Sequence, residues 1–299
     1  MLKRMISKLR HHYRMYMAAV FSTNALLKIA ELRVLRAGLE ERQPDNLALC
    51  GCKVYSQNDE DGIIAAIFDR IGGNRTFLEI GLQDGTECNT LHLMMQGWRG
   101  GWVEADPEFC QSIRGALGTD SVPGTFKLFQ DFARTSNIAA LYRDVCTWVG
   151  ESDLALFSLD IDGNDLHVLE ALLKSGASPT VICAEYNGKF PVPMALSVAQ
   201  DEARGWARDD YFGASLQALS NLLDEFGYGL VTCSLFGANA FFARRGFAGD
   251  IRFRTPSELW QPLRLHMTPY PAGHVPSLKY ARDVLAHHLE TKSAAKDEA

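Results

Sequence analysis

The length and composition of the chain indicate a globular protein with a buried core. Of its 299 residues, 47% are hydrophobic and 22% are charged, and a chain of this length buries most of the surface that it exposes when unfolded. The net charge of −6 argues against nucleic acid as a partner. The seven cysteines are odd in number and scattered, which excludes a disulfide framework or a structural zinc site and favours a reducing cytoplasm.

The N-terminal segment differs from the rest of the chain in its charge. Residues 1–36 hold eight basic residues and one acidic residue, so this segment carries +7 and the remaining residues carry −13. Such asymmetry indicates a separate role for the segment. We interpret residues 1–50 as a helical extension, of which residues 1–40 pack on the body or on a second subunit, or lie on the inner face of an anionic membrane.

The helix of this extension is predicted from its ends. Ser22 or Thr23 is a suitable N-cap for a helix over Asn24–Arg36, and Gly38 is typical of a helix end. The longest apolar run nearby, Met15–Phe21, is shorter than the roughly 20 residues of a spanning helix, and no signal-peptide cleavage site follows it. We therefore expect neither a membrane span nor an export signal.

From about residue 62, helical periods alternate with short apolar runs, which is typical of a largely parallel sheet. Strands are predicted at Thr76–Ile80, Gly101–Glu104, Thr125–Phe129, Leu154–Leu159, Thr180–Ala184, Gly229–Cys233 and Ala240–Ala243. Helices are predicted at Ile63–Ile71, Thr90–Gln96, Pro107–Leu117, Ile138–Val145, Leu166–Leu173 and Ser215–Phe226. Because the last two strands form a hairpin, we predict an α/β fold with an open, mostly parallel, seven-stranded Rossmann-like sheet and helices on both faces, rather than the six-stranded dinucleotide fold.

The first motif lies where the first strand runs into a glycine-containing turn, in the segment FLEIGLQDG over residues 77–85. A ligand at the carboxyl edge of a parallel sheet approaches the backbone closely, which Gly81 permits, and Gly85 allows a turn geometry that other residues avoid. Glu79 would order the loop or face the ligand. A glycine turn with a structural role only would show the same pattern, so this motif alone does not establish a ligand-binding site.

The second motif places an acid at the end of the next strand. Glu104 follows Trp102-Val103, and a carboxylate at this position of a nucleotide-binding α/β fold accepts hydrogen bonds from both ribose hydroxyls. Asp106, before Pro107, is interpreted as a helix N-cap. The spacing fits both NAD and S-adenosylmethionine, whereas the sequence contains no P-loop motif for a nucleoside triphosphate.

The third motif brings acidic residues to the ends of two neighbouring strands. Asp160 and Asp162 follow the fourth strand, and Glu185 and Asn187 follow the fifth. Adjacent strands lie about 4.8 Å apart, so Asp160, Glu185 and Asn187 can converge on one point and bind a hard divalent ion such as Mg²⁺. Without a metal, the same carboxylates would act as a general base. His167 is a further candidate base.

Taken together these motifs resemble one known family. SQ…EDG at residues 56–62, FLEIG, VEADP, SLDIDGND, AEYN, DYFGAS and NAFF at residues 239–242 occur in the order found in FkbM-type methyltransferases, over about residues 54–245. The resemblance implies a class I methyltransferase fold, S-adenosylmethionine as methyl donor and an oxygen acceptor on a sugar, a polysaccharide or glycolipid precursor, or a secondary metabolite. The turn Gly81-Leu-Gln-Asp-Gly85 departs from the general pattern, which has a third small residue.

The resemblance also implies roles for single residues. Gly81 and Glu104 would contact the cofactor, with Glu79, Gly85 and Asp160 beside it. Asp131 would bind the adenine amino group, and Ser56, Gln57 and Asp61 would close over the cofactor. The long connection over residues 186–215 is expected to hold the acceptor. Its candidate substrate-binding residues are Tyr186, Trp206, Tyr211 and Phe212.

These expectations divide the chain into three parts: the extension 1–50, a methyltransferase domain at 51–250, and a C-terminal extension at 251–299 with a short helix and a flexible tail. The expected partner is a small-molecule or glycan acceptor. Two alternatives belong to other functional classes. An NAD-dependent sugar oxidoreductase would need the compact GxGxxG turn that the sequence does not contain, and a non-catalytic module would be held at a membrane by its basic helices.

Overall fold

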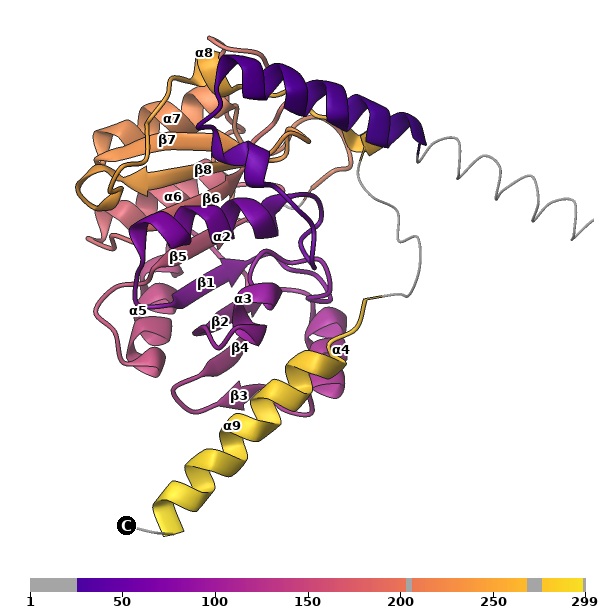
Figure 1. Cartoon of the computed structure of the whole chain (residues 1–299). Coiled ribbons are helices and arrows are strands. Elements are labelled where there is room, and N and C mark those ends of the chain that lie inside the picture. Colours follow the sequence, from indigo (N-terminus) through magenta and orange to yellow (C-terminus); the bar gives the residue numbers. More distant parts are fainter. Residues whose placement is uncertain (1–25, 203–205, 268–275, 298–299) are drawn as a thin grey trace, which may run out of the picture.

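The structure, a computed structural model, describes residues 26–202, 206–267 and 276–297. Eight strands form one sheet (Figure 1). They are β1 Thr76–Ile80, β2 Arg99–Glu104, β3 Ser121–Val122, β4 Phe126–Gln130, β5 Leu156–Leu159, β6 Val181–Glu185, β7 Tyr228–Cys233 and β8 Asn239–Arg244. The helices are α2 Glu60–Ile71, α3 Leu91–Met95, α4 Pro107–Leu117, α5 Ile138–Val149, α6 Asp165–Lys174, α7 Leu216–Glu225, α8 Pro256–Leu259 and α9 Lys279–Asp297. Short 3₁₀ turns are η1 Leu47–Cys50, η2 Arg245–Phe247 and η3 Leu265–Met267, and a further helix spans residues 26–42.

The order of the strands determines where a ligand can bind. The sheet runs β3-β4-β2-β1-β5-β6-β8-β7. The strands from β4 to β6 are parallel, whereas β3, β7 and β8 pair antiparallel with their neighbours. The chain winds outward from β1 through β2 to β4, and then returns to the other side of β1 with β5 and β6. The switch point therefore lies between β1 and β5, where open α/β sheets bind ligands at the carboxyl ends of their strands.

Helices cover both faces of the sheet and bury one hydrophobic cluster on each. The first cluster joins α2, α3, α4 and α9 to the sheet, with Ile63, Trp98 and Trp102 among its members. The second joins α5, α6 and α7 to the other face, with Leu141, Leu169 and Leu219. The strands between these layers are buried on both faces, which explains their continuous apolar sequences.

Local sequence signals account for the position of the first helix after β2. Asp106 caps α4 by accepting hydrogen bonds from the backbone N–H groups of Glu108 and Phe109, and Pro107 occupies the first helical turn. Gly118 ends the helix in the left-handed conformation, with φ of 75°. The predicted bounds of this helix are confirmed, and its N-cap residue Asp106 also donates its backbone N–H to the Glu104 carboxylate.

Three sequence expectations need correction. The sheet has eight strands because residues 121–122 add a two-residue strand antiparallel to β4, and so short a strand leaves no periodic signal. The helix of the extension continues through Gly38 to residue 42. Leu35 and Leu39 pack on Leu235 and Phe236, and this packing outweighs the roughly 1 kcal/mol cost of a helical glycine.

The third correction concerns the C-terminal extension. Its helix is not short: α9 spans 19 residues and packs on α3 and α4, as Figure 1 shows for the yellow helix that runs past α4. The predicted flexible tail from residue 291 is helical up to Asp297. The predicted N-caps Ser22 and Thr23 and the apolar run at residues 15–21 lie outside the described residues. In the part of the chain that is described, no helix is long and apolar enough to cross a membrane.

Candidate active site at the switch point of the sheet

A pocket of about 400 Å³ opens at the carboxyl edge of the sheet, at the switch point between β1 and β5. Its walls come from the loops after β1, β2, β4 and β5, from the end of β6 and from the connection that precedes α7. Five carboxylates line it, namely Glu104, Asp131, Asp160, Asp162 and Glu185, and no lysine, arginine or histidine of the described residues does so. The pocket therefore favours a cationic or neutral ligand.

Glu104 is buried at the end of β2 and joins two loops of the pocket. Its Oε2 accepts hydrogen bonds from the backbone N–H groups of Leu82 and Gln83, with N···O distances of 3.2 and 2.8 Å. Its Oε1 accepts one from Asp106 N–H at 2.8 Å. A carboxylate offers about four acceptor positions, so Oε1 can accept a further hydrogen bond from a ligand hydroxyl. The backbone contacts fix the carboxylate in place for that role.

The loop after β1 depends on two glycines for different reasons. Gly81 has φ of 80°, and a Cβ atom there would lie 1.6 Å from the carbonyl oxygen of Asp160. Gly85 has φ of 76° and packs against the indole of Trp102. Gly81 lines the pocket and Gly85 does not. The first glycine therefore allows the β1 and β5 loops to meet beneath the ligand, and the second forms the turn.

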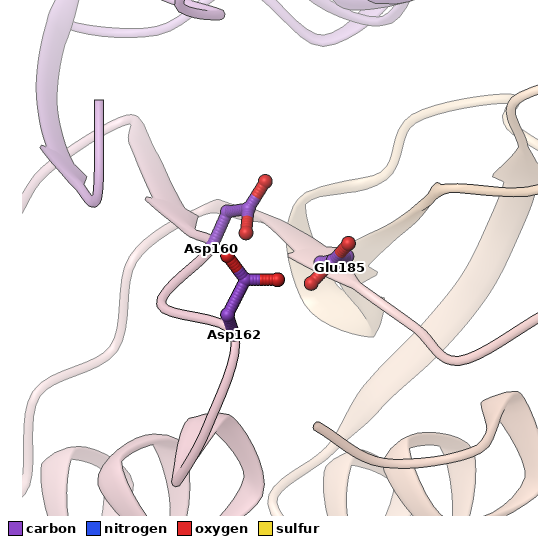
Figure 2. Close-up of side chains that lie close together, drawn as sticks. All are labelled: Asp160, Asp162 and Glu185. Atoms are coloured by element: carbon purple, nitrogen blue, oxygen red, sulfur yellow. The ribbon is translucent and has the colours of Figure 1, made fainter. Parts of the chain in front are cut away.

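Three carboxylates gather on the other side of the pocket. Asp160 and Asp162 come from the loop after β5 and Glu185 from the last residue of β6, and one oxygen of each lies within 4.8 Å of the other two (Figure 2). All three side chains are half-buried. The Oε2 atom of Glu185 is buried and has no hydrogen-bond partner among the described residues. A buried acceptor without a donor indicates that a proton or a cation belongs here.

Burial is the main reason why the pKa values of these three carboxyl groups are raised. It raises the pKa of Glu185 and of Asp160 well above the ordinary carboxyl range, and the negative charge of each raises the pKa of the other further. The pKa of Asp162 is also raised by burial and by Asp165. Asp165 is fully buried and accepts hydrogen bonds from the N–H groups of Ile161 and Gly163, at 2.9 Å each. It therefore holds the loop that carries Asp160 and Asp162.

Several residues predicted for the site do not line the pocket but order its walls. Glu79 is buried on the α3 side of β1, where it accepts hydrogen bonds from Asn89 N–H and Thr90 N–H. Its pKa is raised by burial, although these hydrogen bonds oppose the rise. Asp61 accepts hydrogen bonds from the N–H groups of residues 54–56 and from the Ser56 hydroxyl. That contact orders the segment ahead of Gln57, which does line the pocket.

Two further predicted residues are engaged elsewhere. The ring of His167 donates a hydrogen bond from Nε2 to the carbonyl of Val198, so it does not face the reacting groups. The side chain of Asn187 is buried and donates from Nδ2 to the carbonyls of Asp210 and Phe212. Asn187 was predicted to join Asp160 and Glu185, but its side chain holds the connection before α7, and the carboxylate that lies beside those two is Asp162.

The four aromatic residues predicted for the acceptor separate into two pairs. Trp206 and Phe212 line the pocket, with ring centroids 6.4 Å apart in an edge-to-face arrangement. Tyr186 is buried in the core and donates its hydroxyl to the carbonyl of Gln261. The hydroxyl of Tyr211 accepts a hydrogen bond from Ala199 N–H. Tyr186 and Tyr211 therefore do not line the pocket and are engaged behind the wall that Trp206 and Phe212 form.

Sequence reasoning missed other residues of the pocket. Gln83 lines it and has φ of 52°, an uncommon conformation for a residue other than glycine. The sequence signal that could have identified Gln83 is its position between Gly81 and Gly85. Phe132 and Ala133 line the pocket beside Asp131, and Leu263 reaches it from the segment after α8. No motif marks Leu263, since only the folded chain brings residue 263 to this edge of the sheet.

No protein-family model matches the sequence, and no curated protein sequence matches it either. Solved structures that are similar include an O-methyltransferase from Bacillus cereus in complex with S-adenosylhomocysteine, at 15% identity over 72% of this chain and 88% of that chain, with a TM-score of 0.38. A methyltransferase from Podospora anserina bound to S-adenosylhomocysteine is 15% identical over 57% and 72% of the two chains, with a TM-score of 0.37. A conserved hypothetical protein from Streptococcus pyogenes is 14% identical over 61% and 96%, with a TM-score of 0.38. Similarity at this level does not identify the family of this chain, so its function is inferred from its own pocket.

Proposed function

We propose that the protein is an S-adenosylmethionine-dependent O-methyltransferase of the FkbM type. Its acceptor would be a hydroxyl of a sugar, a polysaccharide or glycolipid precursor, or a secondary metabolite. The observation that carries the proposal is the sheet order combined with the position of Glu104. A dinucleotide-binding sheet has six strands in the order 3-2-1-4-5-6, whereas here antiparallel β8 is inserted between β6 and β7. Glu104 ends β2 and lines the pocket at the same switch point, where nucleotide-binding α/β folds carry an acid that binds ribose.

The residues of the pocket fit this cofactor. The free acceptor position of Glu104 Oε1 suits ribose hydroxyls, and Asp131 at the pocket wall suits the adenine amino group. S-adenosylmethionine supplies an electrophilic methyl group on a positively charged sulfur. The carboxylates around the pocket would stabilise that charge. Gln57 lines the pocket on the segment that Asp61 orders and would cover the cofactor.

Acceptor activation is assigned to the cluster of Asp160, Asp162 and Glu185. A sugar hydroxyl is a very weak acid, so attack on a methyl group requires that its proton be removed or its oxygen be stabilised. Three carboxylate oxygens within 4.8 Å form a donor set that suits Mg²⁺ or Mn²⁺. Such an ion would bind the acceptor hydroxyl and lower its pKa. The unpartnered Oε2 of Glu185 supports this assignment.

The acceptor would lie against Trp206 and Phe212. Their rings stand at the side of the pocket formed by the connection before α7, and aromatic faces pack well on the C–H face of a sugar ring. Because the pocket is acidic, the acceptor is neutral or cationic rather than a phosphate or a carboxylate.

Thermal unfolding with added ligands tests the proposed function. S-adenosylhomocysteine should raise the unfolding temperature because it binds only the folded chain, whereas NAD at the same concentration should leave it unchanged. Stabilisation by NAD but not by S-adenosylhomocysteine would show an oxidoreductase instead. No stabilisation by either ligand would favour a non-catalytic module.

A further inference from the structure

The helix at residues 26–42 has two apolar stripes on opposite sides. One stripe packs on the body: Leu39 is buried, Leu32 and Leu35 are half-buried, and together they contact the cluster around Leu235 and Phe236. Figure 1 shows this indigo helix lying across the end of the molecule beside α8, far from α9. The packed stripe accounts for the attachment of the helix to the body.

The second stripe is exposed. Leu26, Leu27, Ile29 and Val34 have 67%, 64%, 49% and 73% of their surface accessible. At 3.6 residues per turn, Leu26, Leu27 and Val34 lie on the side of the helix that faces away from the packed leucines, and Ile29 lies at the edge between the two sides. Four large apolar side chains within nine residues form an exposed apolar patch, and such patches mark sites that contact another molecule or a membrane.

The charge beside this patch indicates what covers it. Residues 1–25, which directly precede the patch, contain Lys3, Arg4, Lys8, Arg10 and Arg14 and no acidic residue. The chain beyond residue 36 carries −13. A negatively charged surface would therefore attract the N-terminal segment and repel the body, which orients the molecule with the patch toward that surface.

We propose that the exposed stripe Leu26, Leu27, Ile29 and Val34, together with the basic residues before it, docks on an anionic phospholipid surface. An interfacial helix buries its apolar side chains among the lipid head groups while basic residues contact anionic lipids. A second copy of the chain is the weaker occupant, since a stable protein interface uses about 20–30 residues a side and this stripe supplies four large side chains.

The docking helix and the pocket are connected through neighbouring residues of the chain. The helix packs on Phe236 and Met267, and Ala238 and Leu263, close to them in the sequence, line the pocket. If the proposed methyltransferase function holds, docking would hold the enzyme at a surface that can also carry a lipid-linked acceptor. The docking itself does not depend on that function, because the stripe and its charge lie outside the pocket.

Vesicle co-sedimentation of the full chain tests the proposal. The protein should bind phosphatidylcholine vesicles that contain phosphatidylglycerol, and this binding should fall as salt concentration rises because salt screens charges beyond about 10 Å at 0.1 M. The double variant Leu26→Glu/Val34→Glu should bind at least about tenfold more weakly. The matched control Tyr280→Glu/Leu289→Glu changes two exposed apolar residues on α9 and should bind like the wild type. Unfolding temperatures establish that both variants fold.

Several outcomes would overturn the proposal. These are no binding of the wild type to anionic vesicles, equal binding to pure phosphatidylcholine, binding that ignores salt, or unchanged binding of the folded Leu26→Glu/Val34→Glu variant. Sedimentation velocity gives a further check. A wild-type dimer that this variant dissociates would assign the stripe to a second copy. If the variant does not fold, the dependence of wild-type vesicle binding on salt concentration still decides the proposal.

Discussion

Glu185 has a buried carboxylate oxygen without a hydrogen-bond partner among the described residues, and one of its oxygens lies within 4.8 Å of oxygens of Asp160 and Asp162. Three negative charges at this separation repel one another unless a proton or a cation neutralises them. The raised pKa values of Asp160 and Glu185 show the first solution, since burial and mutual repulsion favour protonation. A divalent ion provides the second, and it must displace the bound protons.

Titration with Mn²⁺ distinguishes these states. We expect the wild type to bind Mn²⁺ with an affinity that rises with pH, because the raised pKa values mean that protons leave when the ion binds. Glu185→Gln should lower the affinity at least about tenfold. The control Glu170→Gln removes a half-buried carboxylate on α6 that pairs with Lys174, away from the pocket, and should have no effect. Failure of the wild type to bind Mn²⁺ between pH 6 and about 8 would contradict the metal assignment.

Turnover is a second test of these carboxylates. It is measured on an acceptor identified in an activity screen over glycans. Asp160→Asn and Glu185→Gln should each lower turnover by about 100-fold or more, with little change in cofactor affinity. EDTA should abolish activity, and Mg²⁺ or Mn²⁺ should restore it. Activity retained in EDTA but lost in Asp160→Asn would assign a carboxylate base instead. Full activity of both variants would contradict the site.

At the scale of elements, the loops after β1 and β5 are built as one unit. Gly81 contacts the backbone of Asp160, Glu104 holds the N–H groups of Leu82 and Gln83, and Asp165 holds those of Ile161 and Gly163. Gln83 and Asp162, which both line the pocket, have positive φ of 52° each. Such conformations cost free energy and persist where the surrounding structure fixes them.

A pair of glycine variants tests this close contact. Gly81 and Gly97 have nearly the same φ, 80° and 84°, but a Cβ at Gly97 would meet nothing within 4 Å. Gly97→Ala should therefore lose only the roughly 1–2 kcal/mol of the left-handed conformation. Gly81→Ala should lose several kcal/mol more, because the backbone of Asp160 must move. Urea unfolding measures both, and equal losses would contradict the contact.

Helices and strands could be predicted from the sequence more readily than the directions in which their side chains point. Seven strands and the helix Pro107–Leu117 follow from apolar periods and caps, whereas β3 is too short to leave a pattern. Glu79 and Ile80 are neighbours on β1, yet only Ile80 lines the pocket, because adjacent strand residues face opposite sides. Similarly, Asn187 follows Glu185 in the AEYN motif, but its side chain is used by a connection whose course no local pattern predicts.

At the scale of the whole molecule, a buried carboxyl joins segments that are far apart in the sequence. Asp59, before α2, accepts hydrogen bonds from the Ser234 hydroxyl at 2.6 Å and from Leu235 N–H at 3.3 Å. Burial, together with the negative charge of Glu60, raises the pKa of Asp59 to about 7. The contribution of its protonation to stability is therefore fully present below the unfolded pKa of about 4 and is lost as pH rises through about 7.

Stability should consequently fall over this window as pH rises. The loss attributable to Asp59 is at most about 1.4 kcal/mol per pH unit. Asp59→Asn should flatten the dependence, while Asp69→Asn, an exposed acid on α2, should leave it unchanged. Unfolding midpoints in urea at several pH values give the slopes. A wild-type slope that Asp59→Asn does not change would show that Asp59 ionises normally in the folded chain.

Calorimetric titration with S-adenosylhomocysteine tests the central claim most directly. The wild type should bind it at one site, and Glu104→Gln should bind at least about tenfold more weakly because charge-assisted hydrogen bonds to ribose are lost. Glu108→Gln, an exposed acid in the first turn of α4, should bind like the wild type. The claim would be contradicted if the wild type did not bind the ligand, or if a folded Glu104→Gln variant bound it with unchanged affinity.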